Sequence, residues 1–419
     1  MTRVGRGSIA AAIAAGGLLT AALAAAGTAS TAVEEWPQFR GPERSGVSRF
    51  TGLLGTWPAE GPRQIWRRPI GEGFSGVVAG GGRLYTMYAA EHEGKPTELV
   101  AALDPATGQE VWRTPVADRY DTQFGNGPRS TPTVSGDTVF VVGSRGTVAA
   151  LAMKDGAVRW KLELTEAFGS KVPTWGFSGS PLVDDGKVLV EGGGPQGKAV
   201  AALDAATGKV LWTAGDGGQE PGYNTPLAVD LAGSHQYLHF LGSRLVSFSA
   251  AGKELWSRAW PDGELHAMPL FVPPDRVFGS GVEGVGGALL RVEAASDGMK
   301  VTEVWTNPTF RTHFNAAVLH GEHLYGFDNT TLKCVSLKDG SVAWVKRGLG
   351  KGSLILADGH LIVLSDDGRL VLADASPSAY VERGVVQALT GRCWTPPSLV
   401  GGRVYVRNHA EIVAYEVKG

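Results

Sequence analysis

Val100-Ala-Ala-Leu-Asp-Pro-Ala-Thr-Gly-Gln-Glu-Val-Trp-Arg-Thr114 is the stretch that decides the fold, because it returns almost unchanged further along the chain. The second copy reads Val200-Ala-Ala-Leu-Asp-Ala-Ala-Thr-Gly-Lys-Val-Leu-Trp-Thr213. Copies that match only in part lie elsewhere in the chain. Self-similarity at a fixed period is the sequence signature of a repeat architecture. The period of this element therefore predicts the fold.

One repeat unit contains four short strands separated by tight turns. Its strands are expected at Pro132–Val134, Thr138–Val142, Thr147–Ala152 and Ala157–Leu162. The connections Ser-Gly-Asp, Ser-Arg-Gly and Lys-Asp-Gly are typical of hairpin turns. Each unit is therefore predicted to be one four-stranded antiparallel blade.

Tryptophans on the fourth strands mark the period, at intervals of roughly 40 to 50 residues. They are Trp66, Trp112, Trp160, Trp212, Trp256, Trp305 and Trp344. An eighth fourth strand is expected near Tyr380–Arg383, where the tryptophan is lost, and the last set from Pro396 to Val417 has only three strands. The strand at Gln64–Ile70 has no strands before it, so it should complete that last blade and close the ring. The prediction is an all-β, eight-bladed propeller with no helix in the mature chain.

The chain divides into three parts by composition. Residues 1–32 resemble a signal peptide, with Arg3 and Arg6 before the uncharged run Ile9 to Ala26 and small residues for cleavage after it. An uncleaved anchor is the alternative, although the Ala- and Gly-rich run is only marginally long. Residues 33–63 are expected to form an ordered arm, and residues 64–419 the propeller. Cleavage implies a periplasmic or secreted protein without a transmembrane span in its mature form.

Composition excludes several functions. The 39 basic residues are balanced by 41 acidic residues, which argues against nucleic acid as a partner. Cys334 and Cys393 are the two cysteines; packing residues are favoured over a disulfide bridge, and no Cys-x-x-Cys-His is present for haem attachment. Nucleophile-elbow and phosphate-loop motifs are absent. A monomer is expected.

The side chains of the repeated element are suited to forming turns and packing blades together. Asp104 and Asp204 can accept backbone N–H bonds across a turn, and Gly108 and Gly208 can supply positive φ. The seven marker tryptophans are large flat groups suited to docking one blade on the next. Groups repeated around a ring cannot all converge on one ligand, so this element is interpreted as scaffold.

The unit ending in Ala-x-Asp-x-x-Thr-Gly-x-x-x-Trp resembles the tryptophan-docking repeat of the pyrroloquinoline quinone (PQQ) type propellers. Such repeats occur in quinoprotein alcohol dehydrogenases and in the outer-membrane-assembly propeller BamB, and the resemblance covers nearly all of Gln64 to Gly419. The arm Trp36-Pro-Gln-Phe-Arg-Gly-Pro is similar to the start of exported bacterial PQQ-like propellers. The resemblance implies the fold more strongly than a function.

The resemblance allows two functions. Quinoprotein dehydrogenases commonly hold PQQ against adjacent cysteines and bind Ca²⁺ through Glu, Asn and Asp; this chain has no adjacent cysteines and no acidic cluster in the relevant loops. We therefore expect no catalytic residues and no metal, and favour a binding or scaffold propeller of the cell envelope. A PQQ- and Ca²⁺-dependent alcohol or sugar dehydrogenase is the alternative.

A ligand site is expected in the loops that do not repeat, which lead from each fourth strand to the next inner strand and converge at one channel mouth. They supply Arg129, Trp175, Tyr223, Asn224, His266, His313, Asn315, Lys351 and Trp394. Aromatic, cationic and amide groups suit a planar anion, a sugar or a side chain of an envelope protein partner. The alternative is that they cap the channel and satisfy each other, and a metal bound by the two histidines is a weaker hypothesis still.

Overall fold

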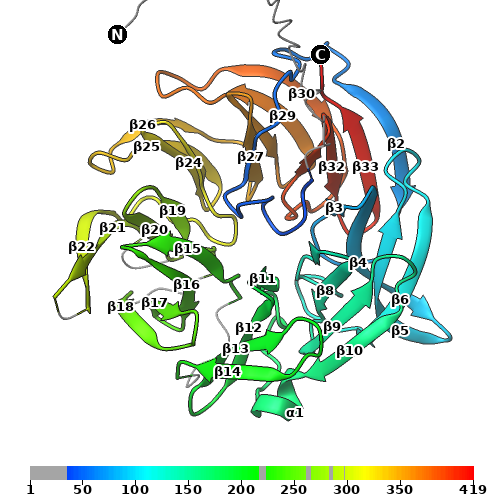
Figure 1. Cartoon of the computed structure of the whole chain (residues 1–419). Helices are drawn as coiled ribbons and strands as arrows, with labels where there is room; N and C mark the ends of the chain where they lie inside the picture. The colour runs from blue at the N-terminus through cyan, green and yellow to red at the C-terminus, as the bar shows by residue number, and fades with distance from the viewer. Residues whose placement is uncertain (1–34, 217–222, 261–265, 283–285, 297) are drawn as a thin grey trace, which may run out of the picture. The chain divides into compact units, whose positions relative to one another are not determined.

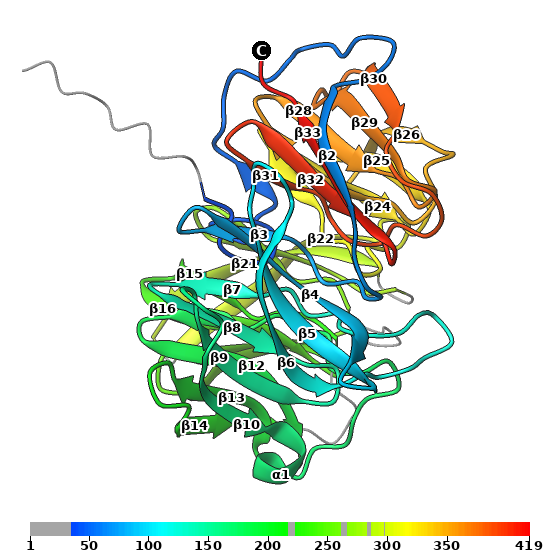
Figure 2. The same cartoon turned by 90° about the vertical axis from the view of Figure 1, so that its right-hand side faces the viewer.

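The described residues form eight antiparallel sheets arranged around a common centre (Figures 1 and 2). This computed structural model describes residues 35–216, 223–260, 266–282, 286–296 and 298–419. The eight-bladed propeller predicted from the repeat is confirmed. The predicted signal peptide lies outside the described residues. Among those residues, no helix has the length and apolar character needed to cross a membrane.

Blades 1 to 4 follow one another along the chain, each with its innermost strand first. Their strands are, for blade 1, β3 Val78–Gly80, β4 Arg83–His92, β5 Lys95–Leu103 and β6 Glu110–Asp118; for blade 2, β7 Thr133–Ser135, β8 Thr138–Val142, β9 Thr147–Ala152 and β10 Val158–Glu163; for blade 3, β11 Leu182–Asp184, β12 Lys187–Gly194, β13 Lys198–Asp204 and β14 Val210–Ala214; for blade 4, β15 Leu227–Leu231, β16 Ser234–Leu241, β17 Arg244–Ser249 and β18 Glu254–Ala259.

Blades 5 to 7 continue the same order, and blade 8 takes its outer strand from the start of the propeller. Their strands are, for blade 5, β19 Leu270–Val272, β20 Arg276–Ser280, β21 Gly287–Ala295 and β22 Gly298–Asn307; for blade 6, β23 Val318–His320, β24 His323–Asp328, β25 Thr331–Ser336 and β26 Val342–Lys346; for blade 7, β27 Ser353–Ala357, β28 His360–Leu364, β29 Arg369–Asp374 and β30 Glu382–Gln387; for blade 8, β31 Ser398–Val400, β32 Arg403–Arg407, β33 Glu411–Glu416 and β2 Arg63–Pro69.

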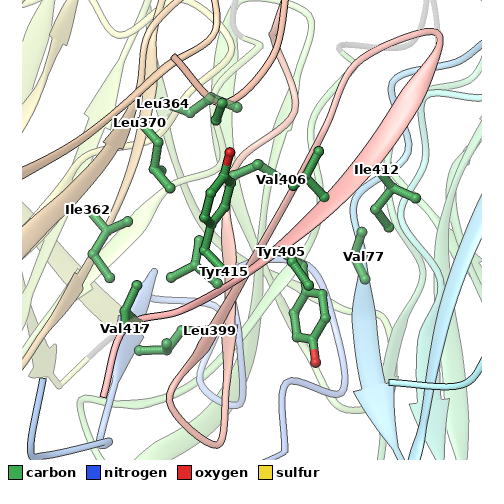
Figure 3. Packing of buried hydrophobic residues seen from close by; sticks show 14 of the residues in the cluster. Val77, Ile362, Leu364, Leu370, Leu399, Tyr405, Val406, Ile412, Tyr415 and Val417 are labelled. Atoms are coloured by element: carbon green, nitrogen blue, oxygen red, sulfur yellow. The ribbon is translucent and has the colours of Figure 1, made fainter. Parts of the chain in front are cut away.

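The ring closes through backbone pairing between β2 and β33, which places Trp66 opposite Ala414. The predicted closure by an N-terminal strand is therefore confirmed. Figure 3 shows Tyr415 directed toward Leu364 and Leu370 of blade 7, so apolar side chains also join the last two blades. Closure in this way joins the two ends of the propeller by backbone hydrogen bonds, so β33 is not left as an edge strand.

The expectation that the mature chain has no helix is wrong, because α1 spans Leu164–Phe168 directly after β10. Leu164 and Phe168 are one helical turn apart and both are buried, so a single turn brings two apolar side chains into the core of blades 2 and 3. Gly169 ends the helix in the left-handed conformation at φ 71°. The helix has only five residues, which is too few for an apolar periodicity to predict it.

The marker tryptophans lie between blades. Six indole Nε1 groups donate to a backbone carbonyl of the next blade around the ring: Trp66 to Pro105, Trp112 to Met153, Trp160 to Ala205, Trp212 to Ala250, Trp305 to Leu337 and Trp344 to Ser376. Trp256 differs, since it donates to Gln236 Oε1 of its own blade at 2.9 Å. The turn that receives an indole is fixed by its aspartate: Thr207 N donates to Asp204 Oδ1 at 2.8 Å.

The first part of the arm, residues 36–48, lies along inner strands of the ring (blue in Figure 1). The later part lies at the outside, where Trp57 N donates to Arg383 O of the outer strand β30. Ala79 N of blade 1 donates to Trp36 O, and Val134 N of blade 2 donates to Pro37 O. The arm strand β1, Val47–Ser48, then pairs in parallel with β27 of blade 7. The innermost strands of a propeller expose an unpaired edge to the channel, and the arm supplies those edges with partners.

Adding a methyl group at Gly208 should destabilise the protein by about 1–3 kcal/mol more than adding one at Gly233. Both glycines have positive φ, 72° and 79°, so alanine introduces similar backbone strain at each. A Cβ at Gly208 would lie 2.7 Å from the Trp160 ring, whereas one at Gly233 meets nothing within 4 Å. The denaturant midpoints of Gly208→Ala and Gly233→Ala measure the difference, and equal midpoints would show that blade docking tolerates the extra atom.

Candidate functional site

A pocket of about 350 Å³ lies at the channel mouth, on the side where the inner strands begin. The loops that enter it connect fourth strands to inner strands. The structure places all nine predicted site residues in its wall: Arg129, Trp175, Tyr223, Asn224, His266, His313, Asn315, Lys351 and Trp394. We call this space the mouth pocket. Its remaining wall includes Phe39, Phe74, Phe124, Thr131, Ser178, Ser180, Thr225, Met268, Phe314 and Pro396.

Seven rings form a closed collar in the wall of the mouth pocket. Neighbouring ring centroids are 4.9 to 6.5 Å apart in the order Trp175, Tyr223, His266, His313, Phe314, Trp394, Phe124 and back to Trp175. The rings come from blade connections spread around the propeller. Edge-to-face and offset contacts at these distances stabilise each pair by about 0.5–1.5 kcal/mol. The collar is therefore a preformed aromatic surface.

The two collar histidines are neutral at neutral pH. Burial lowers the pKa of His266 to about 4, and the positive charge of Lys351 acts in the same direction. Burial, Lys351 and His266 together lower the pKa of His313 to about 3. Lys351 Nζ lies 3.1 Å from His313 Nδ1, so a neutral His313 can accept a hydrogen bond from the ammonium group. Lys351 is thus the charged partner in this part of the collar.

Arg129 lines the mouth pocket, but its hydrogen bonds hold its own loop. Nη1 donates to Gly127 O at 2.8 Å, and Nη2 donates to Thr122 Oγ1 and to Gly125 O at 2.8 and 2.9 Å. Its guanidinium also lies 5.3 Å from the Phe74 ring centre. These contacts fix the loop that carries Phe124 across the mouth, so Arg129 positions the collar.

The amide side chains of the mouth pocket are also engaged by the fold. Asn224 donates to Phe240 O at 3.0 Å and accepts from Phe240 N, and Asn315 donates to Gly352 O at 2.9 Å. Trp394 Nε1 donates to Asp366 Oδ1 at 2.8 Å. By contrast, the buried Trp175 Nε1 has no hydrogen-bond partner in the described structure. An unpartnered buried donor is costly, and because this N–H has almost no accessible surface it is shielded from the mouth pocket.

Sequence reasoning missed Phe39 and Phe124 as parts of the site. Phe124 closes the collar between Trp175 and Trp394, and its carbonyl accepts from Arg392 Nη1 at 2.7 Å. It lies in a loop position without a counterpart in other repeats, so no alignment of repeats could place it. Phe39 reaches the mouth pocket from the arm, whose path inside the ring has no signal in the repeat. Phe314 lies between the predicted residues His313 and Asn315, whereas the mouth loop that carries Phe74 contains no predicted site residue.

The mouth pocket does not offer the ligands that Ca²⁺ prefers. Its described lining residues include no aspartate or glutamate, whereas Ca²⁺ sites commonly use several carboxylate oxygens. Within the described part of the chain, no group of three or more His, Cys, Asp and Glu side chains is arranged to hold a metal ion. Cys334 and Cys393 are buried, separate thiols, so no adjacent pair faces a quinone. The described residues of the mouth pocket do not fit a PQQ–Ca²⁺ pair.

The repeat, the eight blades and the aromatic channel mouth define a PQQ-type β-propeller. The family described as outer membrane protein assembly factor BamB matches residues 96–346, and the chain belongs to that family. The outer membrane protein assembly factor BamB of Yersinia pestis is 29% identical over 189 residues. That similarity covers 41% of this chain and 42% of the relative, so the chain spans less than half the length of this relative.

Solved structures share the fold at low sequence identity. BamB from Moraxella catarrhalis is 14% identical, with a TM-score of 0.60 over 84% of this chain and 97% of its own. The quinohemoprotein alcohol dehydrogenase from Comamonas testosteroni is 13% identical, with a TM-score of 0.67 over 92% of this chain and 81% of its own. At these identities the likeness shows the propeller fold, which both proteins have in common with this chain.

The collar histidines should make the protein less stable as the pH falls from about 6.5 toward 3. In the unfolded chain a histidine binds a proton near pH 6.5, but His266 and His313 do so only near pH 4 and 3 in the fold. The unfolded state therefore binds more protons in this interval, and acid favours unfolding. The His266→Gln/His313→Gln variant should lose less thermal stability between pH 7 and 4 than the wild type.

His235 provides a control, because its effect on stability should change with pH in the opposite direction. Burial alone would lower its pKa, but bonds to Asp230 Oδ1 and Asp184 Oδ2, at 2.8 and 2.9 Å, raise it above the ordinary value. Its contribution is present at low pH and lost as the pH rises through that raised value. His235→Gln should therefore cost more stability at pH 5 than at pH 8. Parallel melting profiles for the wild type and both variants would contradict these assignments.

Proposed function

We propose that this protein is an exported, non-catalytic binding or scaffold propeller of the cell envelope, with a ligand or a partner's side chain bound in the mouth pocket. The aromatic collar, with Lys351 beside His313 in the same wall, is the observation that carries the proposal. A closed ring of aromatic groups around a cavity is costly to leave exposed to water, because apolar surface is stabilised by burial. Occupation of the cavity by a flat apolar group would bury that surface.

The polar groups of the mouth pocket favour a planar anion over a sugar. Sugar hydroxyls need acceptors as well as donors, and Asn224 already accepts from Phe240 N. Lys351 is a charged donor, and the described lining residues include no carboxylate. The nearest described negative charge that acts on Lys351 is Asp366, which accepts from Trp394 Nε1. A flat aromatic body with a carboxylate therefore fits the chemistry of the wall: stacking for the rings and a charge-assisted hydrogen bond for the carboxylate.

The family supports the envelope part of the proposal. The relatives of Yersinia pestis and Moraxella catarrhalis are described as BamB, the former as an outer membrane protein assembly factor. We extend to this chain a role in which the propeller binds an envelope protein and does no chemistry of its own. The signal-like N-terminus agrees with an exported location, periplasmic or secreted. The mouth pocket would then receive a side chain of that partner or a small anion.

A PQQ- and Ca²⁺-dependent dehydrogenase is the second candidate, and the propeller likeness to a quinohemoprotein alcohol dehydrogenase favours it. The described part of the wall has no carboxylates, which argues against it. Incubation of the mature protein with PQQ and Ca²⁺ distinguishes the two candidates. Stoichiometric quinone absorbance together with alcohol-dependent reduction of an artificial dye would overturn the non-catalytic proposal.

The mature protein should bind 2-naphthoate about tenfold or more tightly than neutral 2-naphthamide. The two probes share a flat bicyclic body, but only the carboxylate gains a charge-assisted hydrogen bond, which is worth about 1.5–3 kcal/mol. Isothermal titration calorimetry measures both affinities. Equal affinities would show that the mouth pocket does not recognise the charge.

Lys351→Met should abolish this preference, because it keeps an apolar stem of similar length and removes the ammonium group. Lys346→Met is the matched control, since Lys346 lies outside the mouth pocket with its Nζ 4.8 Å from the Tyr380 ring centre. The control should retain the wild-type preference. If both variants retain it, another group binds the carboxylate.

A further inference from the structure

Two buried arginines anchor the arm at the channel axis. Arg40 and Arg44 are 3% and 2% exposed, although arginine is almost never fully buried without partners. Arg40 donates to Ala316 O at 2.8 Å and to Ala317 O at 2.6 Å. Arg44 donates to Pro226 O at 3.3 Å and to Pro181 O. The two side chains therefore tie the arm to blades 3, 4 and 6.

The residues that accept these bonds follow lining residues of the mouth pocket in the sequence. Pro181 directly follows Ser180, Pro226 directly follows Thr225, and Ala316 directly follows Asn315. Ser180, Thr225 and Asn315 all line the mouth pocket. The bonds to Pro181, Pro226 and Ala316 thus fix carbonyls one residue from the pocket wall, and the bond to Ala317 fixes one two residues away.

The same three connections carry collar rings. Trp175, Tyr223 and His313 lie a few residues before Pro181, Pro226 and Ala316 in their respective loops. Loops on the surface are more mobile than the strands they connect unless they are tied down. Bonds to the arm act at the end of each loop, where it enters the inner strand.

The arm also contributes a side chain to the wall itself. Phe39, the neighbour of Arg40 in the sequence, lines the mouth pocket and packs against the apolar core between blades 4 and 5. Its ring is therefore set in place by the same segment that fixes the loops. Removing the arm from the ring would take away one lining group and three loop anchors together.

The buried charges of the arm are retained at neutral pH. Burial lowers the pKa of Arg40 to about 10 and that of Arg44 to about 9, so both guanidiniums stay protonated. A buried guanidinium is stabilised only while its N–H groups find acceptors. Both arginines find them on backbone carbonyls of different blades, which makes the fit of the arm sensitive to the positions of those blades.

We propose that Arg40 and Arg44 are positioning residues of the mouth pocket, which couple insertion of the arm to ligand binding. The arm holds the loops of blades 3, 4 and 6 and presents Phe39, so the pocket is complete only when the arm is inserted. This inference rests on the proposed binding function of the mouth pocket. By linkage, a ligand that binds the complete pocket must in turn stabilise the inserted arm.

Hydrogen–deuterium exchange and calorimetry on the full mature chain test the coupling, with 2-naphthoate as the probe. Arg44→Lys keeps the charge but loses the planar fork that reaches two carbonyls. It should weaken naphthoate binding about tenfold and speed exchange in the 169–181 loop. Arg49→Lys is the matched control in the same arm, because Arg49 is an exposed residue paired with Glu43; it should change neither quantity. In the wild type, naphthoate should slow exchange in residues 36–48.

A merely structural role for Arg44 would change the melting temperature without changing these readouts. The proposal is overturned if Arg44→Lys binds naphthoate as the wild type does, or if naphthoate leaves exchange of the arm unchanged while binding the pocket. Should naphthoate fail to bind the wild type, the proposed function fails, but exchange of the 169–181 loop still decides the role of Arg44. Unchanged exchange relative to Arg49→Lys would then overturn that role.

Phe39→Ala keeps the proposal testable if Arg44→Lys does not fold. This change removes the arm's side chain from the pocket wall and leaves both arginines in place. It should weaken naphthoate binding at least fivefold and reduce the protection of residues 36–48 by the probe. Wild-type affinity together with wild-type protection would contradict the coupling.

Discussion

Among the described residues, six junctions between blades depend on the contact between an indole and the turn of the next blade. Trp160 shows its two parts: Nε1 donates to Ala205 O at 3.0 Å, and the flat ring lies where a side chain on Gly208 would have to be. The hydrogen bond fixes the height of the indole, and the glycine lets the backbone approach its face. Repetition of this contact sets the angle from blade to blade. Because Trp66 of β2 docks on blade 1 in the same way, the contact continues across the point of closure.

Contacts between blades do not provide hydrogen-bond partners for the inner strands at the axis of the ring. The inner strands begin side by side around the channel and present backbone groups with no neighbouring strand. Arginine suits this place, because one guanidinium carries five donors in a planar fork and can serve carbonyls from different strands. Arg40 and Arg44 bind carbonyls at the starts of three inner strands, and β1 pairs with a fourth. An apolar plug of the same volume would leave those carbonyls without donors.

Much of the fold could be predicted from the sequence, since a repeat reports the same contact many times. Asp204, Gly208 and Trp212 recur with fixed spacing, and the missing fourth strand of the last set required a partner from the N-terminus. The short helix at Leu164–Phe168 and the course of the arm could not be predicted in the same way, because each occurs once. Phe39 and Phe124 share this limit: their positions follow from tertiary packing, which a single sequence does not reveal.

The candidate site divides into groups that the fold already uses and groups that retain binding capacity. The donors of Arg129 hold its loop, Asn224 is bonded twice to Phe240, and Trp394 is bonded to Asp366. A group whose hydrogen bonds are satisfied internally gains little from a ligand, since one bond would replace another. Lys351 differs, because an ammonium has three donors and its described bond to His313 uses one. Trp175 Nε1 also has no described partner, but it is buried and shielded from the pocket. Recognition of a charged group at the mouth pocket therefore falls chiefly on Lys351, while the remaining predicted residues shape the space in which it acts.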